Sequence, residues 1–315
     1  MQRDPNPQSA AHPEGRLSRR ALLQQGAIVP IGGALALGLP AAAASGEPNG
    51  RAANRGDDRP RNIIWMVSDG MSAGVPAMAD AFSQLVRGKG TTWFELARRG
   101  EGVHHGLLET GSLSSAVTDS AAAATAWSSG SQVFNGSLNV LPDGTKLTPF
   151  APLMRDRGKA LGLVTTTKIT HATPAGYAAV TPDRDLEHDI APQYIGLVDV
   201  ALGGGRKFFD PAMRPDGADV YERYRSKGYT VCTTRAELRG AANANRILGC
   251  FRDDHLPYTI DQHHWPHQHT EVPSLAEMTR TALGVLDRKP NGFFLMVEGG
   301  RIDHAAHNND AAGLL

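Results

Sequence analysis

The sequence predicts an α/β protein rich in tight turns, with buried strands of a parallel sheet. Three observations predict it. Hydrophobic residues make up 41% of the 315 residues and charged residues 20%, which excludes a disordered chain. The 35 glycines and 20 prolines favour many tight turns, and several short apolar runs end in polar residues. The formal net charge of +0 gives no basic surface for nucleic acid, and 2 cysteines exclude a disulfide scaffold.

The first 44 residues are predicted to be an export signal. Paired arginines, Arg19 and Arg20, precede an apolar stretch, Ala27–Leu39, and small residues up to Ala44. This pattern resembles a twin-arginine signal, which implies passage through the twin-arginine export machinery and a periplasmic or extracellular location. A membrane anchor is the weaker alternative, because a span needs about 20 apolar residues and Pro30 interrupts this run. Residues 45–60 read as a polar linker, and no membrane span is expected in residues 61–315.

Three apolar runs are predicted to be strands buried on both faces of the sheet. They are Asn62–Val67, Ala160–Thr166 and Gly292–Val297. An alanine-rich helix is expected to begin at Asp119-Ser120, between the first two strands.

Polar residues follow the predicted strands, where ligands bind in open α/β sheets. They include Asp69, Thr173 and Glu298. After Glu298, Asp303 and His307 are four residues apart and would share one face of a helix. This spacing allows the carboxylate and the imidazole to coordinate one zinc ion. A solvated helix start is the alternative for this pair alone, but Glu298 beside it favours a metal site.

Two serines compete for the role of nucleophile. Gly70-Met71-Ser72-Ala73-Gly74 matches the G-x-S-x-G elbow of serine hydrolases and predicts a serine esterase. Ser120 begins the alanine-rich helix, where backbone N–H groups and the helix dipole would favour a phosphate. Its alternative role is an N-cap. The Ser72 hypothesis leaves Glu298, Thr173 and the Ser120 helix without roles.

Four segments together resemble the alkaline phosphatase family, from about Arg61 onward. They read N-I-I-W-M-V-S-D-G-M, T-D-S-A-A-A-A-T-A-W-S-S-G, H-A-T-P-A-G-Y and V-E-G-G-R-I-D-H-A-A-H. The resemblance implies a doubly wound α/β sheet with flanking helices, in an alkaline-phosphatase-like catalytic domain over 61–315. It also implies a site with two Zn²⁺ and one Mg²⁺. It implies hydrolysis of many phosphate monoesters through a phosphoserine, and it allows a homodimer.

The resemblance also implies roles for individual residues. Ser120 would be the nucleophile and a metal ligand, and Arg184 would hold the phosphate. The other implied metal ligands are Asp69, Thr173 and Glu298 around magnesium, with Asp69 shared with one zinc, and Asp303 and His307 on the second zinc. His171 and His304 stand where other family members carry an acidic residue and a lysine, and His171 could ligate a metal directly.

The family resemblance implies further zinc ligands, an Asp-His pair and another histidine, beyond the Glu298 segment. We therefore expect the sheet and the metal sites to be incomplete in these 315 residues, and the chain to aggregate and bind fewer than three metals. A non-catalytic metal- or phosphate-binding protein is the third hypothesis. Asp254-His255 is a weak substitute for the missing pair, because it comes in the wrong order along the chain. The His263–His269 tract is expected to be a solvated loop, and the pairing of Cys232 with Cys250 is left open.

Overall fold

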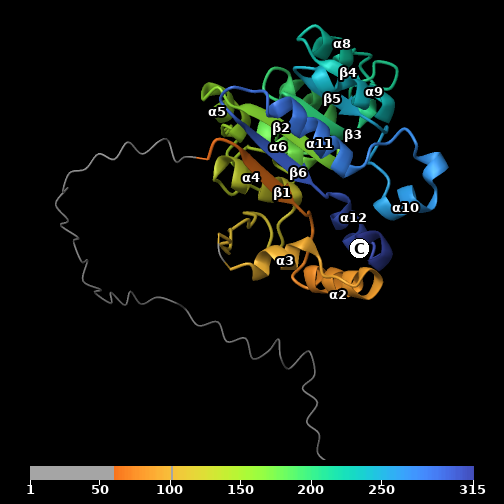
Figure 1. Ribbon diagram of the computed structural model, residues 1–315. Helices are drawn as coiled ribbons and strands as arrows, with labels where there is room; N and C mark the ends of the chain where they lie inside the picture. The colour runs from red at the N-terminus through yellow and green to blue at the C-terminus, as the bar shows by residue number, and fades with distance from the viewer. Residues whose placement is uncertain (1–59, 101) are drawn as a thin grey trace, which may run out of the picture. The chain divides into compact units, whose positions relative to one another are not determined.

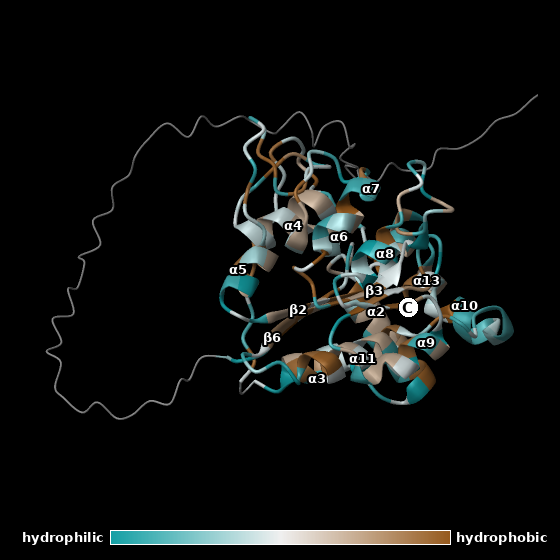
Figure 2. Ribbon diagram, turned by 90° about the horizontal axis from the view of Figure 1, so that it is seen from above, coloured by the Kyte–Doolittle hydropathy of each residue, from teal (hydrophilic) through white to brown (hydrophobic). Residues whose placement is uncertain are grey.

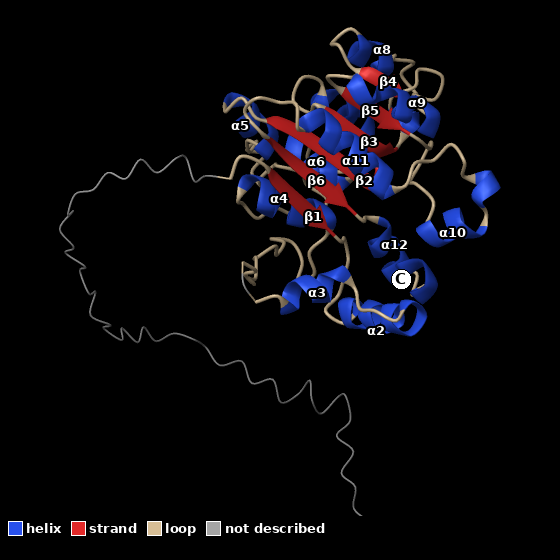
Figure 3. Cartoon of the chain, viewed as in Figure 1, coloured by secondary structure: helices blue, strands red, loops and turns tan. Residues whose placement is uncertain are grey.

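The computed structural model describes residues 60–100 and 102–315; the predicted signal and nearly all of the predicted linker lie outside the described residues. Six strands form one sheet in the order β1-β6-β2-β3-β5-β4, and every neighbouring pair is parallel. Figure 3 shows this sheet with helices on both sides. The strands are β1 (Ile63–Val67), β2 (Ala160–Lys168), β3 (Val200–Gly204), β4 (Thr230–Cys232), β5 (Ile247–Cys250) and β6 (Phe293–Glu298).

Helices connect the strands, as parallel pairing requires. Those of the first half are α2 (Val75–Arg87), α3 (Thr92–Arg98), α4 (Ser120–Ser129), α5 (Phe150–Asp156), α6 (Ala172–Ala178) and α7 (Glu187–Ile190). Those of the second half are α8 (Val220–Arg225), α9 (Arg235–Gly240), α10 (Thr259–His264), α11 (Leu275–Leu286), α12 (Arg301–His307) and α13 (Ala311–Leu314). No helix of the described residues is both long and apolar enough to span a bilayer.

Alternate side chains of the central strands enter two separate cores, which confirms the predicted doubly wound α/β class. On one face, Leu161 and Leu163 of β2 pack with residues of α4, α5 and α6. On the other, Val164 of the same strand packs with residues of α9 and α11. The period of two along a strand sends neighbours to opposite faces, so both faces must be apolar. Figure 2 shows the apolar strands between these two layers of helices.

One strand differs from its prediction. The run at Asn62–Val67 forms β1, but β1 is the edge of the sheet and pairs with β6 alone. Ile64 is 51% exposed and Met66 74% exposed, so the strand is not buried on both faces (Figure 1). An apolar run specifies a strand that can be covered on two sides, whereas burial depends on which elements lie beside it.

Three smaller expectations are also resolved by the fold. Cys232 and Cys250 are both free and buried, so no disulfide joins them. The histidine tract is not a plain loop, because Thr259–His264 forms α10 and a 3₁₀ turn follows at Pro266–Gln268. The helix expected to carry Asp303 and His307 is present and begins at Arg301.

Candidate active site

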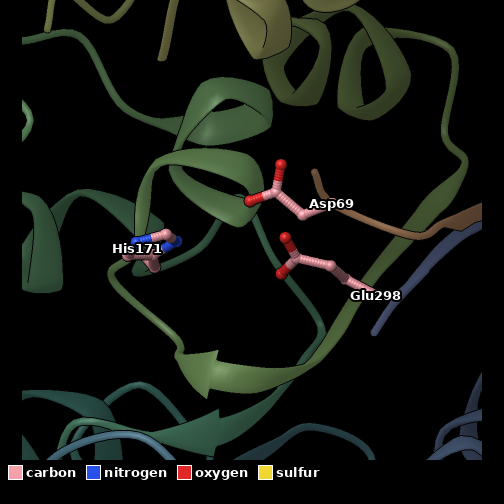
Figure 4. A group of neighbouring side chains, drawn as sticks. All are labelled: Asp69, His171 and Glu298. Carbon is pink, nitrogen blue, oxygen red and sulfur yellow. The ribbon is translucent and has the colours of Figure 1, made fainter. Parts of the chain in front are cut away.

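The carboxyl ends of β1, β6 and β2 lie side by side and bring three predicted ligands together. Val67 at the end of β1 is opposite Glu298 at the end of β6, and Glu298 is opposite Thr165 of β2. One ligand atom each from Asp69, His171 and Glu298 lies within 4.8 Å of the others. In Figure 4 the carboxyl groups of Asp69 and Glu298 are neighbours, with His171 across from them.

Ser120 faces this cluster from the start of α4. Its Oγ donates a 2.9 Å hydrogen bond to Asp69 Oδ2. The N-cap is Asp119, whose Oδ1 accepts a hydrogen bond from the backbone N of Ala122 at 2.9 Å, so the alternative that Ser120 is the N-cap is wrong. With Asp119 as the cap, the Ser120 hydroxyl is free to point at Asp69.

Arg184 lies beside the cluster, between Asp119 and His171. One guanidinium nitrogen contacts Asp119 Oδ2 at 3.0 Å, and the other lies 2.9 Å from His171 Nε2. The backbone N of Arg184 donates to the carbonyl of Gly136 at 2.7 Å, while Gly136 N donates to Asp119 Oδ2 at 3.0 Å. These contacts hold Arg184 against the beginning of α4.

Asp303 and His307 share one face of α12, as their spacing predicts. His307 Nε2 lies 3.4 Å from Asp303 Oδ1, and the His307 side chain is largely exposed. Asp303 also packs against Gly70: a Cβ placed on Gly70, whose φ is +62°, would lie 2.3 Å from Asp303 Oδ1. The absence of a side chain at Gly70 therefore lets Asp303 approach Asp69.

The acidic groups repel one another in the absence of a cation. Burial raises the pKa of Glu298 to about 7, and the neighbouring Asp69 charge adds to the effect. Burial also raises the pKa of Asp69, followed by the charge of Asp303, whereas the Ser120 hydrogen bond lowers it. Burial and the Arg184 charge lower the pKa of His171 well below its ordinary range, which keeps the ring neutral and able to ligate a metal.

Three buried polar atoms at this site have no hydrogen-bond partner. They are Glu298 Oε1, Thr173 Oγ1 and His171 Nδ1. Thr173 lies close enough to lower the pKa of Glu298, although its hydroxyl makes no hydrogen bond of normal geometry. Buried polar atoms are almost always satisfied in folded proteins. Two oxygens and a neutral imidazole nitrogen left open in one place fit a divalent cation.

A histidine group that the sequence analysis did not assemble borders the site. The ring centroids of His171, His255 and His304 are 4.4 to 5.7 Å apart. His255 comes from the segment after β5, and its Nδ1 accepts from the backbone N of Lys168 at 3.1 Å. No spacing in the sequence indicates this proximity, because it depends on β3 separating β2 from β5. The one signal in the sequence is that His255 also follows the carboxyl end of a strand.

The alternative nucleophile is placed differently. Ser72 is exposed in the turn between β1 and α2, and among residues 60–100 and 102–315 no hydrogen bond links its side chain to a histidine. The Ser120–Asp69–Arg184 arrangement is the one that can bind an anion next to a nucleophile.

Comparison with known proteins agrees with this geometry. Residues 60–315 match the sequence profile of alkaline phosphatase. The chain belongs to the alkaline phosphatase family. It is similar to an alkaline phosphatase of Schizosaccharomyces pombe, with 35% identity over 81% of this chain and 49% of that protein. Alkaline phosphatase 3 of Bacillus subtilis is 32% identical over 82% of this chain and 54% of its own length.

The same family is found among solved structures. The Thermus thermophilus alkaline phosphatase superposes with a TM-score of 0.76 and 46% identity, over 81% of this chain and 53% of that one. A variant of the alkaline phosphatase from the bacterium TAB5 is 28% identical, with a TM-score of 0.67, over 81% of this chain and 68% of that one; it was solved with Mg bound. The chain spans about half the length of the curated relatives named above.

Proposed function

We propose that this chain carries the nucleophile and phosphate-binding half of a metal-dependent phosphomonoester hydrolase. The observation that supports this best is the 2.9 Å hydrogen bond from Ser120 Oγ to Asp69 at the start of α4. This hydrogen bond places a hydroxyl group next to a carboxylate at the N-terminus of a helix. Membership of the alkaline phosphatase family supports the same reaction class.

In the proposed reaction, the Ser120 oxygen attacks the phosphorus of a phosphate monoester. A bond forms between Ser120 Oγ and phosphorus, and the bond from phosphorus to the alcohol oxygen breaks. The proton that Ser120 gives up is balanced by the one that the departing alcohol takes up, and water later cleaves the phosphoserine, which releases phosphate and restores the Ser120 hydroxyl. The backbone N–H groups of α4 and the planar Arg184 guanidinium would hold the phosphate oxygens that do not react. Arg184 would exchange its present contact with Asp119 for the phosphate.

The proposal includes two Zn²⁺ and one Mg²⁺ in the complete site. Oxygens of Asp69, Thr173 and Glu298 suit Mg²⁺, with His171 as an added ligand. Asp303 and His307, together with Asp69 and Ser120, supply the carboxylate, imidazole and hydroxyl groups for Zn²⁺. When bound, these cations lower the pKa of the serine hydroxyl and neutralise the leaving oxygen.

Because a cation stabilises any leaving oxygen, little of the alcohol has to be recognised. We therefore propose small phosphate monoesters in general as substrates. Export through the twin-arginine machinery to the periplasm or beyond, and a homodimeric assembly, belong to the same proposal. The location is supported by the predicted signal in residues 1–44. A related enzyme of Bombyx mori is a membrane-bound alkaline phosphatase, which also agrees with a place outside the cytoplasm.

Two serine variants test the nucleophile. Ser120→Ala should abolish release of p-nitrophenol from p-nitrophenyl phosphate, whereas Ser72→Ala should leave the rate unchanged. Acid quenching during turnover, followed by peptide mass spectrometry, should find phosphate on Ser120. Loss of p-nitrophenyl acetate hydrolysis in Ser72→Ala alone would favour the serine esterase. Binding of inorganic phosphate without turnover would favour the non-catalytic hypothesis.

Metal content tests the ligand assignment separately. The metal-to-protein ratio should fall in Asp69→Ala and in Glu298→Gln, and His171→Asp should change it together with the pH–rate profile. Ser72→Ala is the control, because the Ser72 side chain is exposed and makes no hydrogen bond to the cluster among the described residues. Metal content and pH–rate profiles unchanged by His171→Asp would remove His171 from the ligand set.

A further inference from the structure

Glu187 is a buried carboxylate beside the candidate site that the reaction described above does not use. It is the first residue of α7, and its side chain is 7% exposed. Glu187 Oε1 lies 2.5 Å from Lys168 Nζ, and Oε2 accepts a hydrogen bond from the Thr170 hydroxyl. Both partners lie in residues 168–170, which lead from the end of β2 to His171.

The segment that carries Glu187 also carries Arg184. Arg184 contacts His171 Nε2 at 2.9 Å, so residues 184–187 and 168–171 are joined at both ends. Glu187 holds the beginning of the His171 loop, and Arg184 contacts its last residue. The middle of the loop is fixed too, because the Tyr194 hydroxyl donates to the carbonyl of Ile169 at 2.9 Å.

Burying a carboxylate is costly unless it is paired and hydrogen-bonded. Glu187 meets both conditions, but both of its side-chain partners belong to the four residues that end at His171. Thr170 is fully buried, and its hydroxyl bonds to Glu187 rather than to the sheet. The side-chain contacts of Glu187 therefore stabilise residues 168–171.

Asp199 provides a comparison, because it is an acidic residue whose contacts stabilise the sheet away from the candidate site. Asp199 is also largely buried, and its Oδ2 accepts from the backbone N of Leu161 at 3.1 Å. Its Oδ1 lies 3.2 Å from Lys289 Nζ and 3.4 Å from Arg246 Nε. These partners lie at or just before the amino ends of β2, β5 and β6. The candidate site lies at the opposite, carboxyl ends of the strands.

We propose that Glu187 is a positioning residue for this site: through Lys168 and Thr170 it fixes the loop that sets His171 against Arg184. The inference rests on the proposed function for its consequence, phosphate binding, but not for the contact it describes. Without the Glu187 charge, Lys168 loses its buried partner and the loop is held less firmly, by the Tyr194 contact at Ile169 and by backbone hydrogen bonds. The Arg184 guanidinium is then oriented less firmly, because His171 is one of the two side chains that contact it and Asp119 is the other.

The contact is tested in the purified full chain by NMR of the histidine ring nitrogens. The His171 signal is identified by its loss in His171→Ala. Glu187→Gln should shift the His171 ring resonances, whereas Asp199→Asn should leave them in place. Thr170→Val removes one Glu187 partner and keeps the side-chain shape, so it gives the same test if Glu187→Gln does not fold. Unshifted His171 resonances in a folded variant would overturn the proposal.

The consequence is tested by titration with inorganic phosphate. Glu187→Gln should weaken phosphate binding by about tenfold, the scale on which partners that orient a ligating residue act. Asp199→Asn should lower stability while leaving phosphate affinity unchanged. Equal effects of the two variants on affinity would reduce Glu187 to a stabilising ion pair. If the unmodified chain binds no phosphate, the proposed function fails, and the His171 resonances alone decide whether Glu187 positions the loop.

Discussion

The Ser120 hydroxyl donates to Asp69 Oδ2 across 51 positions of sequence. Asp69 follows an edge strand, and Ser120 begins a helix on one face of the sheet. Strand β1 and helix α4 are not joined by strand pairing, so this hydrogen bond depends on the conformation of the turn after β1. The conformation of that turn therefore decides whether nucleophile and carboxylate meet.

Gly70 is the position where that turn is most easily broken. Its φ is +62°, and an added Cβ would lie 2.3 Å from Asp303 Oδ1 and 2.7 Å from Asp303 Cα. Backbone cannot move away as a flexible side chain can. Gly70→Ala should lower the free energy of unfolding by about 1–2 kcal/mol for the left-handed conformation. It should lose ~1–3 kcal/mol more for the clash, measured by urea denaturation.

A matched glycine separates the two costs. Gly217 has a φ of +64°, and a Cβ added there would meet no atom within 4 Å, so Gly217→Ala loses stability only through its conformation. Metal content should fall in Gly70→Ala, because Asp303 is displaced, and stay unchanged in Gly217→Ala. Equal stability losses and equal metal contents in the two variants would contradict a close Gly70–Asp303 contact.

The buried Glu298 predicts a distinct pH dependence for the metal-free chain. Its pKa rises from the ordinary 4.5 to about 7, so between these values the folded chain holds a proton that the unfolded chain has released. Stability contributed by the protonated form is complete below pH 4.5 and is lost as pH rises to about 7. The loss is on the order of 3 kcal/mol. The raised pKa of Asp69 acts in the same direction.

Denaturation in EDTA across this pH range measures the effect. Glu298→Gln should remove most of the fall in stability, because it cannot ionise. Adding Mg²⁺ and Zn²⁺ to the unmodified chain should do the same, since the cations favour the ionised carboxylates. A metal-free chain whose stability is flat or rises between pH 4.5 and about 7 would be inconsistent with a buried, repelling carboxyl pair.

The N-cap of α4 couples helix stability to the site. Asp119 accepts from Ala122 N and Gly136 N and also contacts Arg184. Asp119→Ala should lower the free energy of unfolding by about 1–2 kcal/mol and misplace Ser120 at the same time. Thermal denaturation and phosphorylation of Ser120 measure the two effects.

Asp219 provides the control for this cap. It caps α8 by accepting from Glu222 N at 2.8 Å, and α8 lies next to β4, away from the cluster. Asp219→Ala should cost a similar stability and leave Ser120 phosphorylation intact. If both variants phosphorylate Ser120 normally, the role of Asp119 is limited to helix stability.

The sequence predicted β1, β2 and β6, the α4 helix and the cluster at their ends, because each depends on local pattern; it did not predict β3, β4 and β5. Asp69 and Glu298 follow apolar runs, so their place at the carboxyl ends of the strands could be predicted from the sequence; Asp303 could be predicted from its four-residue spacing to His307. The exposure of β1 could not, because it depends on strand order. His255 and Glu187 were missed for a related reason: each reaches the site through a tertiary contact with the loop after β2, and no periodicity encodes that contact.

The edge strand gives the last prediction. Met66 is 74% exposed and Ile64 51% exposed on a strand whose outer backbone groups have no partner within the described sheet. An exposed apolar edge strand promotes pairing between molecules, and a lysine at the edge opposes it. The unmodified chain should self-associate on gel filtration as its concentration rises. Met66→Lys should shift the elution toward the monomer, whereas Lys substitution at the exposed Met213, outside the sheet, should not. A monodisperse unmodified chain, or equal effects of the two lysines, would show that the β1 edge does not drive association.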